Sequence, residues 1–266
     1  MPDQSKPHTL TGNFRTHEGV RSRFLESEHH IIVYLPPGYD DDERRRYPVL
    51  YMQDGQNLFD EATAFSGEWH LDEAAEEMIR AGLVAPLIIV GIYNAGAYRI
   101  DEYTPTRDSA RRAGGNADRY GRMLVDELKP FIDSEYRTLT DARNTGIGGS
   151  SLGGLVSLYL ALKYSGIFWN VAVLSPSVWW DNRFIVRRVR ALNAAPPLRV
   201  WLSTGTAEGE GALAGARRVR DALVAKGWTV GESLHYQEIE GARHHESAWA
   251  AIAPAMLRFL FPADSR

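Results

Sequence analysis

A serine between glycines lies at a predicted turn from a strand to a helix. Residues 149–153 read Gly-Ser-Ser-Leu-Gly and fit the pattern G-x-S-x-G, with Ser151 at its centre. The run 144–150 has the composition of a buried strand, and the apolar run that begins at Leu152 is typical of a helix. Glycines two positions away on either side would let the backbone turn sharply and expose the Ser151 hydroxyl. The pattern therefore indicates a nucleophilic serine, whereas Ser150 is expected to be structural.

A serine nucleophile requires a base, and three histidines follow Ser151 in the chain. His235 falls inside a predicted strand, where a core or sheet-surface role is expected. His244 and His245 follow the last predicted strand and directly precede the final predicted helix. Because the chain order in folds with such a serine turn is Ser, acid, His, the predicted base is one of this pair.

The carboxylate that orients the base should follow the preceding core strand. Glu208 lies closest to the end of the predicted strand 198–205. Glu210 lies two residues further and is expected to be a solvated loop charge. Asp181 follows the strand before, at 170–176, and is the alternative acid. Proximity to the strand end favours Glu208.

Two backbone N–H groups could bind the negative charge that develops on a reacting oxygen. One is expected from Leu152, directly after the serine. The second is expected from Gln56, in the loop 53–61 that follows an early strand, where Gly55 allows close approach. Asp54 precedes that glycine and is expected to cap the turn rather than take part in catalysis.

Short apolar runs alternate with longer helical patterns along the chain. Seven runs have the length and composition of strands: 30–36, 47–54, 87–93, 144–150, 170–176, 198–205 and 234–241. Helical patterns occupy 68–82, 119–136, 211–227 and 247–261. Pro130 is expected to bend or break the second of these helices.

This alternation predicts a three-layer α/β fold with a mostly parallel central sheet. The first strands lack an intervening helix and are expected to form an antiparallel N-terminal edge. Residues 1–266 are expected to form a single domain, since no long linker or repeat interrupts them. Ligands in such sheets bind at the C-terminal ends of the strands, which is where the candidate residues fall.

Charge and composition exclude several classes of partner and site. The chain has 34 acidic and 30 basic residues, a balance that does not suggest nucleic acid or an anionic membrane surface as partner. The absence of cysteine excludes disulfides, thiolate metal sites and a cysteine nucleophile. No clustered metal-ligand spacing is apparent, so neither a metal nor an organic cofactor is expected. The N-terminus is polar, and no apolar run approaches the roughly 18–20 residues of a membrane span, so a cytoplasmic protein is expected.

Six stretches of the chain resemble the putative esterase family of α/β-hydrolases. That family includes esterase D-like, enterochelin esterase-type, feruloyl and acetylxylan esterases, and the mycolyltransferases. The stretches span about residues 30–250 and read IIVYLPPGYDDDERRRYPVLYMQDGQNLFD, RIDEYTPTR, GIGGSSLGGLVSLYLALKY, VAVLSPSVWW, WLSTGTAEG and GARHHESAW. The resemblance implies an α/β-hydrolase fold, with Ser151 as nucleophile and Glu208 as the acid of the triad.

The resemblance also separates the two histidines. Family members carry a His-x-Glu pattern followed by a tryptophan three residues later, which implies His244 as the base, with Glu246 and Trp249 completing the pattern. His245 then occupies the variable position. The implied reaction is hydrolysis of a small-molecule or carbohydrate ester, of short-chain, acetyl or feruloyl type, through an acyl-enzyme. The alternatives are an acyltransferase with the same triad and, less favoured, a non-catalytic binding protein on the same fold.

Polar and aromatic side chains are expected on loops at the same edge of the sheet, where they could contact the substrate. These residues are Asn57, Phe59, Tyr93, Tyr98, Trp179 and Trp180. Their aromatic faces could stack on a sugar or a phenolic acyl group. The segment 94–118 is expected to form a rim of the site or a contact in a homo-oligomer.

Overall fold

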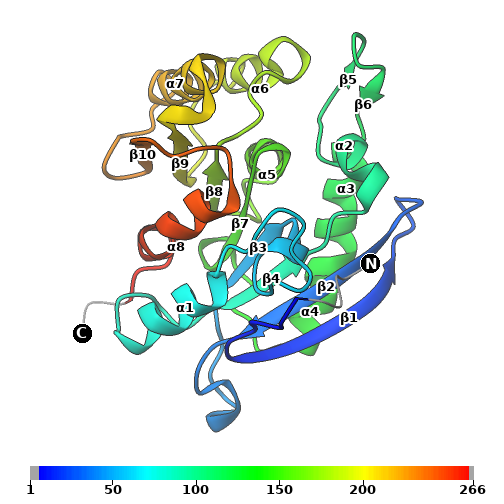
Figure 1. Ribbon diagram of the computed structural model, residues 1–266, viewed down its shortest axis with the longest axis vertical. Coiled ribbons are helices and arrows are strands. Elements are labelled where there is room, and N and C mark those ends of the chain that lie inside the picture. The colour runs from blue at the N-terminus through cyan, green and yellow to red at the C-terminus, as the bar shows by residue number, and fades with distance from the viewer. Residues whose placement is uncertain (1–5, 264–266) are drawn as a thin grey trace.

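The computed structural model describes residues 6–263 and is built around an eight-stranded sheet (Figure 1). The strand order is β1-β2-β4-β3-β7-β8-β9-β10. The strands are β1 (Asn13–Arg21), β2 (Glu28–Leu35), β3 (Val49–Gln53), β4 (Ile88–Ile92), β7 (Thr145–Ser150), β8 (Asn170–Leu174), β9 (Arg199–Gly205) and β10 (Leu234–Ile239). A separate short hairpin joins β5 (Arg107–Asp108) to β6 (Ala113–Gly114).

The pairing of these strands confirms the mostly parallel sheet with an antiparallel N-terminal edge. Strand β2 pairs antiparallel with both β1 and β4, and every pair from β4 to β10 is parallel. All seven predicted strands form, each close to its expected bounds. Strand β1 was not predicted, because this edge strand has no fully buried residue and its polar and apolar residues mix without a continuous apolar run.

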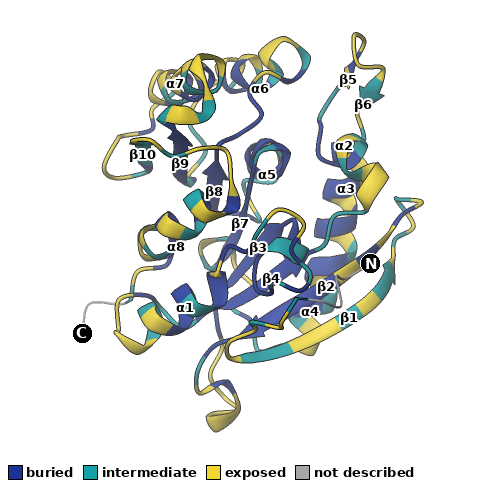
Figure 2. Cartoon of the chain, in the orientation of Figure 1, coloured by how far each residue is buried: buried dark blue, intermediate teal, exposed yellow. Residues whose placement is uncertain are grey.

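Helices cover both faces of the sheet. They are α1 (Leu71–Arg80), α2 (Arg99–Glu102), α3 (Ala117–Arg122), α4 (Lys129–Glu135), α5 (Leu152–Lys163), α6 (Trp180–Arg190), α7 (Glu210–Val224) and α8 (Glu246–Leu260). One apolar core joins the sheet to α3 through α7, and a second core on the opposite face joins it to α1 and α8. Alternate residues of β3 serve the two cores, since Tyr51 faces the first and Met52 the second. Figure 2 shows the buried sheet between the half-exposed helices.

The helix that contains Pro130 is not broken. The chain remains helical from α3 to α4 through a π-helical segment, Met123–Leu128, and Pro130 lies in the first turn of α4. A proline ring collides with the carbonyl four residues earlier, and the wider π spacing in front of the proline moves that carbonyl aside. The expected break is therefore replaced by a local widening of the helix.

No helix in the part of the chain that the structure describes combines the length and apolar character needed to cross a membrane.

Candidate active site

Ser151 occupies the turn between β7 and α5 in a strained backbone conformation. Its φ of 57° and ψ of −122° lie outside the regions that non-glycine residues ordinarily adopt. A Cβ atom on Gly149 would lie 2.9 Å from Cβ of Gln53, and one on Gly153 would lie 3.0 Å from the same atom. Both glycines therefore make room for β3 beside the turn. The Ser151 N–H donates to the Leu174 carbonyl at 3.0 Å, which holds the turn against β8.

The Ser151 hydroxyl lies at the junction of two cavities. Ser151 and His244 both line a larger cavity of about 1270 Å³ and a smaller one of about 640 Å³. The Ser151 Oγ atom lies 3.3 Å from Oγ of Ser177, whose N–H donates to the Ser151 carbonyl. Within residues 6–263, no hydrogen bond joins Ser151 to His244. A rotation about the Ser151 Cα–Cβ bond would redirect the hydroxyl, and such contacts commonly tighten only when substrate is present.

His244 contacts a buried carboxylate, and that carboxylate is Glu208. The Nδ1 atom of His244 lies 2.7 Å from Oε2 of Glu208, whose side chain is only 2% exposed. An ionised carboxylate can only accept hydrogen bonds, so Nδ1 carries the proton and Nε2 is left as the acceptor. The alternative acid, Asp181, instead lies 3.6 Å from Arg187.

Three donors hold the Glu208 carboxylate. Besides His244, the Ser175 hydroxyl donates to Oε1 at 2.5 Å, and the Gly205 N–H donates to the same oxygen at 2.7 Å. Burial alone would raise the pKa of Glu208, but the hydrogen bonds from His244, Ser175 and Gly205 outweigh burial and lower it. Glu208 is therefore ionised at neutral pH. The Ser175 hydroxyl also accepts from Nε1 of Trp249 at 2.9 Å.

Ser175 was not predicted from the sequence as part of the site. A signal was available, because Ser175 falls near the end of the predicted strand 170–176, at the edge where the other candidates lie, and it directly follows β8 in the structure. A serine near a strand end carries no further mark of its role in the sequence. Its positive φ of 44° and its burial appear only in the structure.

The two predicted amide donors lie in the first turns of helical segments. Leu152 is the first residue of α5, and Gln56 lies in a 3₁₀ turn, Gly55–Asn57, that follows β3. First-turn N–H groups have no acceptor within their own helix. A Cβ atom on Gly55 would lie 2.6 Å from the Gly91 carbonyl carbon, so the close approach of this turn to β4 requires glycine. Their joint action on a substrate oxygen stays a prediction.

Asp54 does not cap its turn, and that expectation is wrong. Its side chain makes no capping hydrogen bond. It accepts two hydrogen bonds from Arg99, both at 2.7 Å, and one from Asn94, also at 2.7 Å. The partners come from the segment 94–118, so the carboxylate ties this rim to the end of β3. A sequence cannot show that pair, since 45 residues separate its members.

Of the predicted substrate contacts, three line the cavities. Asn57 and Tyr93 line the larger cavity, and Trp179 lines the smaller one with 51% of its surface exposed. The Asn57 amide donates to Oε1 of Glu246 at 3.2 Å, which joins the loop after β3 to the start of α8.

Two of the predicted substrate contacts are wrong. Trp180 is 1% exposed, packs in the core and donates its indole N–H to the Thr106 carbonyl. Phe59 is also 1% exposed and packs against Phe14 and Tyr34. Aromatic residues serve cores as well as sites, and adjacent tryptophans give no sequence signal for which one turns inward.

The chain is similar in sequence to one protein family and to several known proteins. A family model described as "Putative esterase" matches residues 22–260. The chain is 28% identical over 248 residues to the uncharacterized protein YbbA of Bacillus subtilis (strain 168), covering 89% of this chain and 91% of that protein. It is 26% identical over 234 residues to an endo-1,4-beta-xylanase/feruloyl esterase of Xylanibacter ruminicola, covering 86% of this chain and 29% of that one.

A solved structure shares the fold. The enterobactin esterase of Shigella flexneri matches with a TM-score of 0.76 at 17% identity, covering 97% of this chain and 62% of that one. The family match covers most of the chain. The strand order and flanking helices of this chain agree with the α/β-hydrolase architecture. The chain therefore belongs to the putative esterase family of α/β-hydrolases and is a carboxylic ester hydrolase.

Proposed function

We propose that the chain hydrolyses esters through a Ser151–His244–Glu208 triad and an acyl-enzyme. His244 Nε2 takes the proton of the Ser151 hydroxyl as Oγ attacks the ester carbonyl, and the tetrahedral intermediate forms. The N–H groups of Leu152 and Gln56 stabilise its oxyanion. The alcohol leaves with the proton from His244, and the acyl group remains on Oγ. Water then attacks in the same way and releases the acid.

The contact between His244 and Glu208 is the observation that carries this proposal. It fixes the imidazole tautomer that a general base needs, at the sheet edge where Ser151 also lies. A buried, ionised Glu208 would also stabilise the imidazolium formed when His244 accepts the proton.

We propose short-chain, acetyl or feruloyl-type esters as substrates. Tyr93 and Trp179 offer aromatic faces in the two cavities, on which a phenolic ring or a sugar can stack. The Xylanibacter relative is named a feruloyl esterase, which agrees with a substrate that carries a phenolic ring.

Labelling with a fluorophosphonate probe tests the nucleophile. We expect the wild-type protein to be labelled and Ser151→Ala to lose both labelling and about 10⁴-fold or more of its ester hydrolysis. The matched control is Ser150→Ala, the adjacent buried serine, which should still be labelled. Labelling of Ser151→Ala would overturn the proposal.

A substrate panel tests the proposed substrate class and the choice between hydrolysis and acyl transfer. Nitrophenyl esters of increasing chain length, methyl ferulate and acetylated xylan would be compared, with and without added alcohol. We expect release of free acid to dominate in every case. Preferential transfer to the added alcohol would instead identify an acyltransferase with the same triad.

A further inference from the structure

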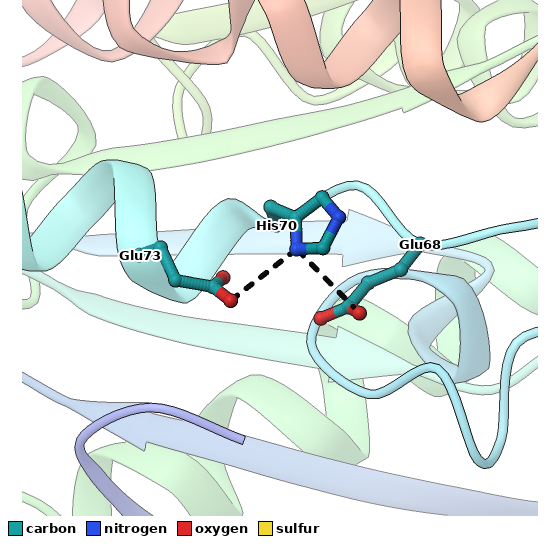
Figure 3. Close-up of side chains that lie close together, drawn as sticks. All are labelled: Glu68, His70 and Glu73. Atoms are coloured by element: carbon teal, nitrogen blue, oxygen red, sulfur yellow. Dashed lines mark hydrogen bonds and ion pairs between the residues drawn. The ribbon is translucent and has the colours of Figure 1, made fainter. Parts of the chain in front are cut away.

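A second cluster of ionisable side chains lies at the start of α1, apart from the candidate active site. Glu68, His70 and Glu73 each place one ligand-type atom within 4.8 Å of the other two. Figure 3 shows the three side chains turned toward one another, with the imidazole between the carboxylates. The Nδ1 atom of His70 lies 3.5 Å from Oε2 of Glu68 and 3.2 Å from Oε1 of Glu73.

One imidazole proton serves both carboxylates poorly. The Nδ1 atom carries at most one hydrogen, and the two carboxylates would have to share it. The contact with Glu73 at 3.2 Å has hydrogen-bond geometry, whereas the contact with Glu68 is longer, at 3.5 Å. A cation at the centre of the three groups would instead be shared by all of them.

Glu68 is buried with part of its carboxylate unpartnered. Its side chain is 1% exposed, and its Oε2 atom accepts from the Thr9 hydroxyl at 2.8 Å. Its Oε1 atom is buried and has no hydrogen-bond partner among residues 6–263. Nor does any lysine or arginine of that part of the chain form an ion pair with Glu68 or Glu73. A buried carboxylate oxygen without a partner is costly, and a cation that also contacts Oε1 would remove that cost.

The spacing and the donor types fit a divalent transition metal. Ligand atoms about 2.0–2.1 Å from a tetrahedral zinc ion lie about 3.3 Å apart, close to both His70 distances. An imidazole together with carboxylates suits zinc and its neighbours, whereas calcium prefers a larger set of oxygens. The His70 and Glu73 side chains are 56% and 38% exposed, which leaves an entry path and room for water as the fourth ligand.

We propose that Glu68, His70 and Glu73 bind a zinc-type divalent cation that has a structural role. The cation would join the segment around Thr9 to the start of α1 through Glu68. Trp69, between two of the ligands, packs on Trp249 with ring centroids 5.5 Å apart. The spacing Glu-x-His-x-x-Glu lies within the predicted helix 68–82 and was therefore not recognised as a set of metal ligands, contrary to the expectation that no ligand spacing is present. This inference does not rest on the proposed function.

Zinc titration of the full chain tests the site. Competition with a chromophoric zinc chelator would be measured for the wild type, Glu68→Gln, His70→Asn and the control Glu77→Gln, an exposed residue on the same helix. We expect one zinc ion per wild-type chain, with a rise in melting temperature. Both ligand variants should bind more weakly by more than the roughly 10–100-fold typical of an outer-shell change, and Glu77→Gln should match the wild type.

Two outcomes would overturn the proposal. One is the absence of zinc binding by the wild type. The other is equal binding by the wild type and His70→Asn, which would place the ion elsewhere, for example at the histidine pair 244–245. Circular dichroism checks that each variant is folded. His70 is exposed and has a positive φ of 51°, which asparagine tolerates, so this variant carries the test if Glu68→Gln does not fold.

Discussion

Ser175 shows how one small side chain can support the charge of another. It donates to Glu208 and accepts from Trp249, and its 5% exposure keeps water away from both contacts. Hydrogen bonds to a charged group are stronger than those between neutral groups. Ser175 therefore acts as a positioning residue in the proposed mechanism, since its hydroxyl bonds Glu208 and Trp249 rather than Ser151 or His244.

Replacing Ser175 by alanine should change how stability depends on pH. The variant loses one of the hydrogen bonds that lower the pKa of Glu208, so this pKa should rise toward its ordinary value of 4.5. A depressed carboxyl pKa contributes stability above the unfolded-state value, and this stability is lost as the pH falls through the folded-state value. At pH 7 we expect the variant to be less stable by about 1.5–3 kcal/mol. The deficit should shrink as the pH falls from about 4.5 through the lowered pKa of wild-type Glu208, because Glu208 becomes protonated first in the variant and then in the wild type.

Urea unfolding at several pH values measures this effect. Ser165→Ala, in the half-buried turn after α5, is the control and should show a small difference that does not vary with pH. A deficit of equal size at neutral and acidic pH would show that Ser175 stabilises the fold without acting on the charge of Glu208.

The adjacent tryptophans should respond oppositely to substitution. Trp179→Ala should raise KM for feruloyl esters more than for acetyl esters, with a change in unfolding free energy within about 1 kcal/mol, because the ring is half-exposed at the smaller cavity. Trp180→Ala should lower the unfolding free energy by about 3–5 kcal/mol, because it empties a core position. Steady-state kinetics and urea unfolding distinguish the two. Equal KM changes for both esters would remove Trp179 from the substrate site.

At the scale of elements, the turn between β7 and α5 depends on packing against a neighbouring strand. Gly149 and Gly153 both face Gln53 of β3 at distances that leave no space for a methyl group. The shape of the turn is thus fixed by an element almost a hundred residues earlier in the chain, in addition to its own glycines.

Gly149→Ala should therefore disturb both stability and turnover. We expect an overpacking penalty of about 1–3 kcal/mol in unfolding free energy, together with a fall in kcat as Ser151 shifts. Gly166→Ala is the matched control, because its Cβ would meet nothing within 4 Å, and it should change stability by at most about 0.5 kcal/mol. A Gly149→Ala protein with wild-type stability and kcat would contradict the packing account.

Some helices and strands were predicted more accurately from the sequence than others. Buried parallel strands such as β3 and β8 were predicted closely, because burial on both faces leaves a nearly continuous apolar run. Edge strand β1 was missed for the opposite reason. Pro130 was correctly expected to disturb the helix that contains it. The π-helical widening was not predicted, since it depends on how the neighbouring helical turns adjust.

For the whole molecule, chain order predicted which residues meet at the edge of the sheet but not how they are supported. The positions of Glu208 and of the pair His244–His245 after successive strands placed them at one edge, and the family resemblance then selected His244, which contacts Glu208. The Asp54–Arg99 pair, the support from Ser175 and the inward turn of Trp180 required coordinates. These contacts join loops whose paths no local pattern fixes.

The Asp54–Arg99 pair should hold the rim 94–118 to the sheet. Asp54→Asn should lower the unfolding free energy by about 1–3 kcal/mol, less than for a fully buried pair, because Arg99 keeps 26% of its side chain exposed. Arg122→Gln is the control. It removes an exposed pair with Asp126 and should cost at most about 1 kcal/mol. A double-mutant cycle with Arg99→Gln measures the coupling, and a value near zero would mean that the rim is held by other contacts.

The two cavities that meet at Ser151 bear on the order in which products leave and water enters. Under the proposed mechanism, the acyl group on Ser151 would occupy one cavity while the departing alcohol leaves through the other. Solvent would then reach the covalent adduct through the vacated cavity. In that case both half-reactions would need no large opening of the protein.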